Sequence, residues 1–252
     1  MIDLHTHILP GLDDGPRTLA ESVSMARAAV ADGIQTIAAT PHVRADYLTE
    51  ASEMERAVTE LGAELRAEGI ELGVRTGGEI ALDRLAIIEA EELLRFGLAS
   101  NPNYLLLEFP YYGFPLALPS QVIELRGRDI TAVVAHPERN AEVQAAPERM
   151  QQIVEHGALV QLTSASIDGR LGRSSSKTAF RLLELGLGHL VASDAHAPGL
   201  RSVGMSAAVK ALDDFDLARW LTEDVPAAIV ANTPIPERPR SRRRRMSHLF
   251  RR

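Results

Sequence analysis

Short apolar segments with strand character alternate with amphipathic helical segments along almost the whole chain. The predicted strands are residues 2–5, 34–40, 71–80, 104–109, 131–135, 159–163 and 189–193. Helices are predicted at 19–31, 51–67, 118–126, 147–156 and 174–185, partly at 82–95, and after the last strand at 204–212, 217–221 and 226–231. About seven β–α units with short connections predict a parallel sheet, either an open doubly wound sheet or a closed barrel.

The residues at the carboxyl ends of the predicted strands distinguish these two architectures. No Gly-x-Gly-x-x-Gly motif and no P-loop follows an early strand, which weakens the nucleotide-binding versions of the open sheet. Polar residues able to bind a metal follow nearly every predicted strand instead. Because the carboxyl ends of the strands converge on one rim in a βα barrel, we predict an α/β barrel with its functional site at that rim.

The first and the last predicted strands both end in paired metal-type ligands. A strand turns successive side chains to opposite faces, so His5 and His7 point the same way, as do Asp194 and His196. With the residues that follow the other strands, the candidate metal ligands are His5, His7, Asp14, His42, Glu79, Glu108, His136, Asp194 and His196. Imidazole nitrogens mixed with carboxylates are the ligands of hydrolytic clusters of two or three divalent ions.

Each candidate also has a purely structural explanation when it is taken alone. The His-x-His pair can be held by hydrogen bonds, and the Asp-Asp-Gly-Pro loop at 13–16 can be an ordinary turn. Glu108 can form a buried salt bridge, while His42 and His136 can be loop histidines. Only the predicted strand at 159–163 ends without a candidate, and this regular placement favours a metal cluster.

Charge is distributed unevenly along the 252 residues, whose net charge is −7. Residues 237–252 carry eight arginines and one glutamate, which leaves a strongly acidic body in front of them. We therefore predict one domain at 1–235 and a disordered Arg-rich tail at 236–252. Such a tail can contact an anionic membrane surface or another acidic surface, or it can be solvated without a dedicated partner.

Several classes of protein are disfavoured by the composition. No apolar run approaches the length of a membrane span, and the N-terminus lacks a basic-then-apolar signal, so we expect a cytoplasmic protein without a transmembrane segment. The chain contains no cysteine, which excludes disulfides, thiolate ligands and a cysteine nucleophile. The acidic body argues against an extended groove for nucleic acid.

The ordered set of motifs resembles that of the polymerase and histidinol phosphatase (PHP) superfamily. The segments that carry this resemblance are His5-Thr6-His7, Asp13-Asp14-Gly15-Pro16, Thr40-Pro41-His42, Gly78-Glu79, Leu107-Glu108-Phe109, Ala135-His136-Pro137-Glu138-Arg139 and Ser193-Asp194-Ala195-His196. Within the superfamily, the Asp-Asp-Gly-Pro and His-Pro-Glu-Arg segments resemble bacterial metal-dependent protein-tyrosine phosphatases of capsule and exopolysaccharide synthesis. The resemblance covers roughly residues 1–235.

This resemblance implies a distorted seven-unit βα barrel, similar to a TIM barrel, that holds three divalent metal ions. Manganese is the metal that we expect first, and nitrogen and oxygen ligands also suit Fe, Zn, Co or Mg. The first ion is expected on His5, His7, Glu79 and Asp194; the second on Glu79, Glu108 and His136; the third on Asp14, His42 and His196. The implied partner is the tail of a membrane tyrosine kinase, and the resemblance also implies a possible homo-oligomer.

The expected reaction is hydrolysis of phosphotyrosine by a metal-activated hydroxide. Arg139 lies three residues beyond a predicted ligand and is expected to bind the phosphate, with Arg201 as a weaker candidate. Tyr111 and Tyr112 are expected to face the phenyl ring of the substrate. The alternatives are histidinol phosphate, a nucleic-acid 3′ end or another small phosphomonoester, since a fold does not fix a substrate. A scaffold that binds a kinase tail without turnover is a further alternative, and no general acid is identified.

Overall fold

The strands of the computed structural model, which describes residues 1–197 and 202–240, form two hydrogen-bonded sheets. One sheet has the order β1-β2-β5, with β1 at Ile2–Thr6, β2 at Thr36–Ala39 and β5 at Gly73–Arg75. The other has the order β10-β9-β8-β7-β6-β3-β4. Its strands are β10 (Leu190–Ala192), β9 (Leu159–Thr163), β8 (Thr131–Ala135), β7 (Tyr104–Glu108), β6 (Glu79–Ala81), β3 (His42–Arg44) and β4 (Tyr47–Leu48).

Two strands of the predicted barrel are each broken into two pieces. Pro41 separates β2 from β3, and the Gly77-Gly78 pair separates β5 from β6. The first pieces pair with each other and with β1, whereas the second pieces pair with each other and with β7. Seven strand positions therefore follow one another around the barrel, and the breaks account for its distortion.

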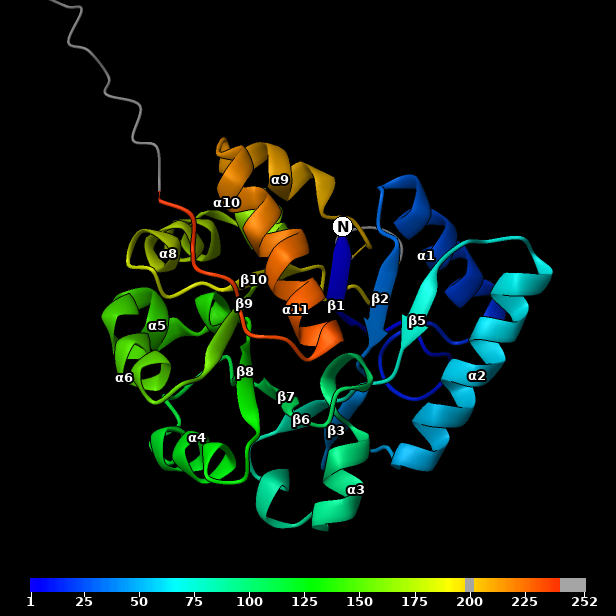
Figure 1. The fold of residues 1–252 in the computed structure, drawn as a ribbon, viewed down its shortest axis with the longest axis horizontal. Helices are drawn as coiled ribbons and strands as arrows, with labels where there is room; N and C mark the ends of the chain where they lie inside the picture. Colours follow the sequence, from blue (N-terminus) through cyan, green and yellow to red (C-terminus); the bar gives the residue numbers. More distant parts are fainter. Residues whose placement is uncertain (198–201, 241–252) are drawn as a thin grey trace, which may run out of the picture.

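The barrel closes between its first and last strands. Thr6 forms a parallel bridge with Ala195, and the backbone N–H of His7 donates to the carbonyl of Ala195 at 2.8 Å. The backbone N–H of Asp194 donates to the carbonyl of His5, also at 2.8 Å. Figure 1 shows β1 beside β10, with the remaining strands leading around to β2. The predicted distorted seven-unit α/β barrel is confirmed.

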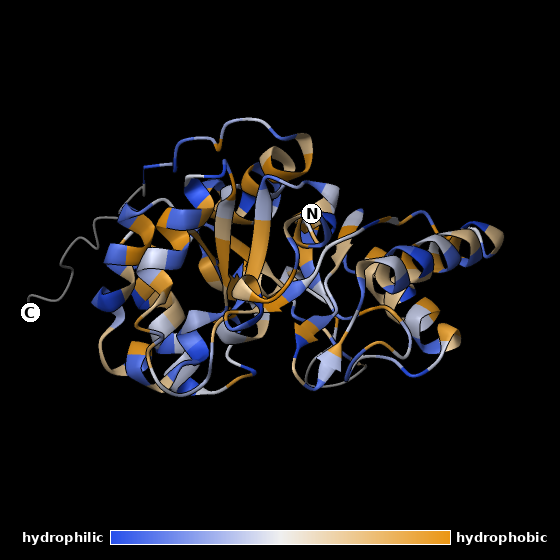
Figure 2. Cartoon of the chain, turned by 90° about the horizontal axis from the view of Figure 1, so that it is seen from below, coloured by the Kyte–Doolittle hydropathy of each residue, from blue (hydrophilic) through white to orange (hydrophobic). Residues whose placement is uncertain are grey.

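Helices surround the barrel on its outside (Figure 1). They are α1 (Leu19–Ala31), α2 (Ala51–Ala67), α3 (Ala90–Arg95), α4 (Leu118–Arg126), α5 (Ala141–Ala145), α6 (Met150–Glu155), α7 (Ser164–Ile167), α8 (Arg173–Glu184), α9 (Ser206–Leu212), α10 (Phe215–Arg219) and α11 (Val225–Ala231). Short 3-10 turns lie at Arg84–Ala86, Leu98–Ser100, Pro137–Arg139 and Pro147–Arg149, and a π-helical turn at Trp220–Asp224 joins α10 to α11. Figure 2 shows hydrophobic residues on the central strands and hydrophilic ones on outer helix faces.

Helix caps and runs of apolar residues set the boundaries of several elements, and these are the elements that the sequence predicted well. Thr18 caps α1 by accepting from the backbone N–H of Glu21, whose side chain returns to the backbone of the cap residue. Strand β7 is apolar without alternation, and Leu105, Leu106 and Leu107 are all fully buried. A continuous apolar run of this kind is typical of a parallel strand covered on both faces.

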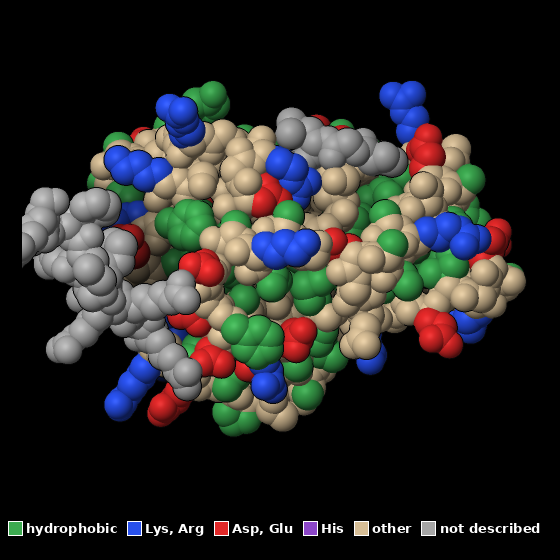
Figure 3. Space-filling model, turned by 90° about the horizontal axis from the view of Figure 1, so that it is seen from above, with side chains coloured by type: hydrophobic (Ala, Val, Ile, Leu, Met, Phe, Trp, Pro, Cys, Tyr) green, Lys and Arg blue, Asp and Glu red, His purple; other side chains and the backbone are tan. Residues whose placement is uncertain are grey.

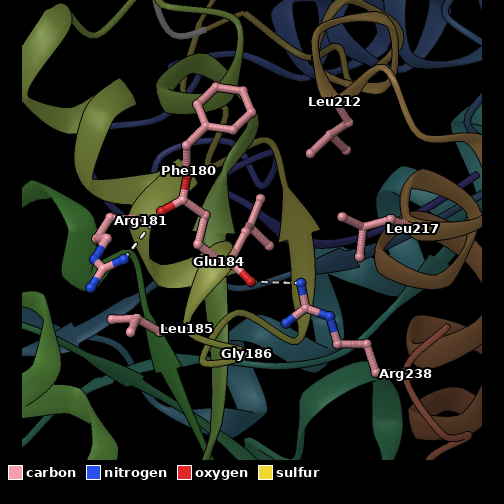
Figure 4. A pocket seen from close by; sticks show the side chains of 9 residues that line it. Phe180, Arg181, Glu184, Leu185, Gly186, Leu212, Leu217 and Arg238 are labelled. Atoms are coloured by element: carbon pink, nitrogen blue, oxygen red, sulfur yellow. Dashed lines mark hydrogen bonds and ion pairs between the residues drawn. The ribbon is translucent and has the colours of Figure 1, made fainter. Parts of the chain in front are cut away.

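The C-terminal arm extends the packed domain beyond the boundary predicted at residue 235. The indole N–H of Trp220 donates to the carbonyl of Pro236 at 3.0 Å, and Arg238 donates to the carbonyl of Leu183 at 2.7 Å. Arg238 also forms one wall of a groove of about 670 Å³ beside α8, lined by Phe180 among others (Figure 4). Residues 236–240 thus contact the domain, and residues 241–252 of the predicted tail lie outside the described residues.

Charged side chains of both signs are interspersed on the face of the molecule shown in Figure 3, where no histidine is visible. In the described ranges, no helix combines the length and apolar character needed to cross a membrane.

The imidazole of His189 makes the stability of the fold sensitive to acid. Burial, and then the nearby Arg238, lower the pKa of His189 from 6.5 to about 4. Its Nδ1 accepts a hydrogen bond from the backbone N–H of Val160 at 3.1 Å, which requires the neutral ring. Between pH 6.5 and 4 the unfolded chain therefore binds more protons at this residue than the folded chain, and its contribution to stability is lost as the pH falls.

We predict that His189→Asn flattens this dependence, because an amide oxygen can accept from Val160 without titrating. Between pH 7 and 5 the wild-type free energy of unfolding should fall by about 1–2 kcal/mol more than that of the variant. Urea denaturation at both pH values measures the difference. Equal losses in the two proteins would contradict the assignment to His189.

Candidate metal centre

The carboxyl ends of the strands, the loops after them and two strand breaks bring all nine predicted ligands to one place in the barrel. His5 lies in β1, and Glu108 is the last residue of β7, whereas His136 directly follows β8. The two strand breaks deliver two more ligands, because His42 begins β3 and Glu79 begins β6. These two residues are paired directly across the parallel ladder, which fixes their side chains next to each other.

Glu79 lies at the centre of the cluster and is fully buried. Its Oε2 is 3.3 Å from the Nε2 atoms of both His5 and His7, and 3.0 Å from Nδ1 of His42. Its Oε1 is 2.8 Å from Nε2 of His136. One carboxylate therefore faces four imidazoles, which come from two strand ends, those of β1 and β8, and from the break before β3.

Asp194 is a second carboxylate that contacts both His5 and His7. Its Oδ1 is 3.4 Å from Nε2 of His5, 3.5 Å from Nε2 of His7 and 3.6 Å from Nδ1 of His196. Asp194 and His136 have positive φ angles of 52° and 38°, respectively. Residues other than glycine rarely adopt this conformation, and it is often retained where a functional side chain must be aimed.

The outer edge of the cluster is formed by Asp14 and Glu108. Oδ1 of Asp14 is 3.2 Å from Nε2 of His196 and 3.5 Å from Nε2 of His42. Glu108 is farther from the histidines, with Oε2 at 3.9 Å from Nδ1 of His42, and its Oε1 accepts from Arg44 at 2.9 Å. Asp14 is the most exposed member of the cluster, so this edge faces the opening of the barrel.

Ligand-type atoms within 4.8 Å of one another form four overlapping groups in the described residues. The groups are His5, His7 and Asp194; His5, Glu79 and His136; His42, Glu79 and Glu108; and His7, Asp14, His42 and His196. The last group contains the residues predicted for the third ion together with His7. Glu79 connects two groups, as a bridging ligand must, but Glu108 groups with His42 rather than with His136. The division of the nine residues among individual ions stays a prediction.

The chemistry of these residues fits divalent cations. Nε2 of His5 and Nε2 of His7 are only 3.2 Å apart, as two nitrogens on one ion at about 2.0–2.1 Å are. Glu79 Oε2 and His42 Nδ1 are buried 3.0 Å apart but not in the geometry of a hydrogen bond, and His136 Nδ1 is buried without a hydrogen-bond partner among the described residues. Buried polar atoms without hydrogen bonds lower the stability of the fold unless another group binds them. A cation can accept lone pairs from both oxygen and nitrogen atoms.

The protonation equilibria agree with a role of the carboxylates as ligands. Burial raises the pKa of Glu79 and of Asp194, but the positive charge of His5 overcomes it and holds both pKa values well below the usual range. Burial likewise lowers the pKa of His5, and Glu79 and Asp194 reverse the direction and raise it. Both carboxylates are therefore ionised near neutral pH and can bind a cation.

The sequence did not predict the residues that orient the ligands through hydrogen bonds on the side away from the cluster. Gln161 places Oε1 3.0 Å from Nδ1 of His5, and this contact leaves Nε2 to face the cluster. The buried carboxylate of Asp3 accepts from the backbone N–H groups of His5 and Ser193, which ties the first strand to the last. A polar residue in the middle of a buried apolar strand, as Gln161 is, was the available signal.

Arg139 lies at the edge of the cluster, where a phosphate-binding residue was predicted. Its guanidinium donates to Oδ2 of Asp194, and its side chain is only 14% exposed. The guanidinium carbon lies 4.7 Å from the centroid of the Tyr111 ring, which in turn stacks parallel to His136 at 6.1 Å. Arg139 and Tyr111 are therefore placed together beside the predicted ligands.

The other predicted substrate-binding residues are placed differently. Tyr112 is 84% exposed and is not brought against the ligands, so its role stays a prediction. Arg201 lies outside the described residues.

Comparisons with known proteins identify the family to which the chain belongs. Residues 1–228 match the family model for capsular polysaccharide synthesis, CpsB/CapC. The chain belongs to the CpsB/CapC family. It is 37% identical over 250 residues to the tyrosine-protein phosphatase YwqE of Bacillus subtilis (strain 168), covering 97% of this chain and 98% of YwqE. It is 29% identical over 205 residues to the tyrosine-protein phosphatase CpsB of Streptococcus pneumoniae, covering 78% and 83% of the two chains.

Solved structures agree with the family assignment. A crystal structure from work on B. subtilis YwqE and S. pneumoniae CpsB, described as metal-dependent tyrosine phosphatases, superposes with a TM-score of 0.86 at 35% identity. The match covers 96% of this chain and all of that one. A β-aspartyl dipeptidase from Fervidobacterium islandicum shares only the fold, with a TM-score of 0.51, 15% identity, and coverage of 84% and 66%. The resemblance to bacterial enzymes of capsule synthesis is confirmed.

We predict that divalent metal stabilises this CpsB/CapC protein. A ligand that binds only the folded state at 100 times its Kd adds about 2.7 kcal/mol, or roughly 5–10 °C for a chain of this length. Thermal unfolding after EDTA treatment, with and without added Mn²⁺, measures this shift. His136→Asn should reduce the shift, whereas His156→Asn, which alters the end of α6, should leave it unchanged. A wild-type protein that is insensitive to Mn²⁺ would refute the metal centre.

Proposed function

We propose that this chain is a metal-dependent tyrosine-protein phosphatase that serves capsular polysaccharide synthesis. The observation that carries the proposal is the position of Arg139 beside the cluster, in contact with both Asp194 and the Tyr111 ring. A phosphate bound there meets a guanidinium, and an aromatic ring attached to that phosphate can meet Tyr111. The membership in a family that contains tyrosine-protein phosphatases supports the same activity.

Each part of this site has a defined task in the proposed reaction. When bound, divalent ions neutralise phosphate charge and make hydroxide available near neutral pH. Arg139 presents a planar donor fork to phosphate oxygens, and its contact with Asp194 aims that fork toward the cluster. The fixed geometry of the histidines and carboxylates restricts where the reacting phosphorus can lie. A thiol route is excluded because the chain has no cysteine.

The more detailed features of the function are proposals as well. We propose three divalent ions, because nine residues with oxygen and nitrogen ligand atoms converge. Manganese is our proposal for the native metal, and ligands without sulfur equally suit Fe, Zn, Co or Mg. The physiological substrate is proposed to be the phosphorylated tail of a membrane tyrosine kinase, with the phosphatase acting in the cytoplasm. The family assignment to capsule synthesis supports this partner.

The second candidate function is hydrolysis of a small phosphomonoester such as histidinol phosphate. The pairing of Tyr111 with Arg139 favours an aryl phosphate over this alternative, because a flat ring gains contact area against Tyr111. A scaffold without turnover is disfavoured, since a scaffold does not require buried ligand atoms that lack hydrogen bonds at one rim.

We predict Mn²⁺-stimulated hydrolysis of para-nitrophenyl phosphate and of a phosphotyrosine peptide. The phosphotyrosine peptide should have a larger kcat/KM than histidinol phosphate, measured by phosphate release under the same metal conditions. Absence of metal-stimulated turnover on every substrate would leave the scaffold as the better explanation. A larger kcat/KM for histidinol phosphate would overturn the choice of substrate class and leave the phosphatase activity standing.

We predict that Arg139→Ala lowers kcat/KM by about 10²–10³-fold, the usual cost of removing a donor to a transition-state oxygen. Arg139→Lys should recover only part of the loss, because an ammonium lacks the planar fork. Arg149→Ala is the matched control, since Arg149 is an exposed arginine that stacks on Phe114 and pairs with Glu142. Metal content should stay near wild type in all three variants, and loss of metal from Arg139→Ala would assign Arg139 to structure instead.

A further inference from the structure

Asp13 is a carboxylate beside the metal centre to which the proposed function gives no role. It precedes the predicted ligand Asp14, and its side chain is only 1% exposed. Oδ2 lies 2.6 Å from Nδ1 of His7 and accepts from the backbone N–H of His42 at 2.9 Å. Oδ1 accepts from the backbone N–H of Gly15, also at 2.9 Å.

These three contacts reach three members of one ligand group. His7, Asp14 and His42 all belong to the group that His196 completes. Asp13 holds the ring of His7 directly, holds His42 through its backbone, and fixes the loop that carries Asp14 through Gly15. The loop also needs glycine at position 15, because a Cβ there would lie 2.3 Å from the carbonyl oxygen of His7.

The ring of His7 has two nitrogens with different surroundings. Nδ1 faces Asp13, while Nε2 faces Glu79 at 3.3 Å and Asp194 at 3.5 Å. A carboxylate at Nδ1 keeps the proton on that nitrogen and leaves the lone pair of Nε2 free to bind a cation. The tautomer of His7 is therefore set by Asp13.

We propose that Asp13 is the positioning residue that assembles the His7, Asp14, His42 and His196 group for a divalent cation. This inference rests on the proposed metal-dependent function and extends it. Asp13 fixes the tautomer of one ligand and the backbone of two others, so a single side chain determines whether the group is preorganised. Partners that orient metal ligands in this way commonly contribute about 10–100-fold to metal affinity.

Asparagine at position 13 cannot reproduce all three contacts. With its oxygen toward Gly15, the amide NH₂ faces the N–H of His42 and forces the proton of His7 onto Nε2. With the amide reversed, the NH₂ faces the N–H of Gly15 and the loop of Asp14 loses its anchor. Each orientation removes at least one of the contacts that the proposal requires.

Asp32 offers a matched control elsewhere in the fold. Its carboxylate also accepts from two backbone N–H groups, those of Met205 and Ser206, and from the hydroxyl of Ser206. It is not a member of any of the four ligand groups found in the described residues. Asp32→Asn thus measures how much stability is lost in general when an amide replaces a carboxylate that anchors a loop.

The experiment compares wild type, D13N, D13S and D32N as full-length chains stripped of metal. Circular dichroism first checks that each variant is folded, and D13S is included because serine can keep the turn at Gly15 without reaching His7. Mn²⁺ affinity and stoichiometry are then measured by calorimetric titration, and metal content by mass spectrometry after gel filtration. Turnover of para-nitrophenyl phosphate is recorded against Mn²⁺ concentration.

We expect D13N and D13S to bind at least one Mn²⁺ about 10–100-fold more weakly than wild type and to regain turnover at high Mn²⁺. D32N should lose stability but keep wild-type Mn²⁺ affinity. Wild-type affinity and stoichiometry in D13N and D13S would overturn the positioning role and leave the metal-dependent phosphatase intact. Absence of Mn²⁺ binding by the wild type would instead refute the proposed function, and the positioning role with it.

Discussion

The closure of the barrel between β1 and β10 is the contact on which the rest of the site depends. His5 and Asp194, which lie near the two ends of the domain sequence, become neighbours at this seam, where the backbone N–H of Asp194 donates to the carbonyl of His5. The buried Asp3 strengthens this seam by accepting from the N–H groups of His5 and Ser193. Burial raises the pKa of Asp3 to about 6, so the seam places a desolvated carboxylate directly behind the ligands.

The two broken strands place their ligands differently from the unbroken strands. In the unbroken strands the ligands come near or after the carboxyl end, as with Glu108 and His136. His42 and Glu79 instead begin the second pieces, β3 and β6, which lead to β7 while the first pieces lead to β1. The breaks thus turn two strands from one sheet to the other and carry their ligands across the opening. Gly78 is required there, because a Cβ would lie 2.7 Å from the ring of Phe96.

The sequence predicted the fold and the membership of the cluster better than it predicted the surroundings of the cluster. Apolar runs and caps such as Thr18 are local signals, and helix α1 was predicted with its observed bounds. The β3–β4 hairpin was missed because Arg44 and Tyr47 lie in a short polar segment, whose pairing depends on contacts with Glu108 and His42. The contact between Gln161 and His5 spans 156 residues, so no local pattern could reveal it. Arg238 was assigned to the tail because composition does not show its contact with Leu183.

The charge balance among the described residues of the site favours binding of a phosphate ester together with cations. Four carboxylates, those of Asp14, Glu79, Glu108 and Asp194, line one rim. Arg139 and Arg44 are the arginines that pair with two of them in the described residues. With the histidines neutral, as metal ligation requires, a phosphomonoester dianion approaching this rim meets these four carboxylates and two arginines of the described residues. Divalent ions held by the histidines and carboxylates would reverse the negative sign of this balance and leave Arg139 to interact with phosphate, so the proposed ligand set would serve both metal binding and substrate binding.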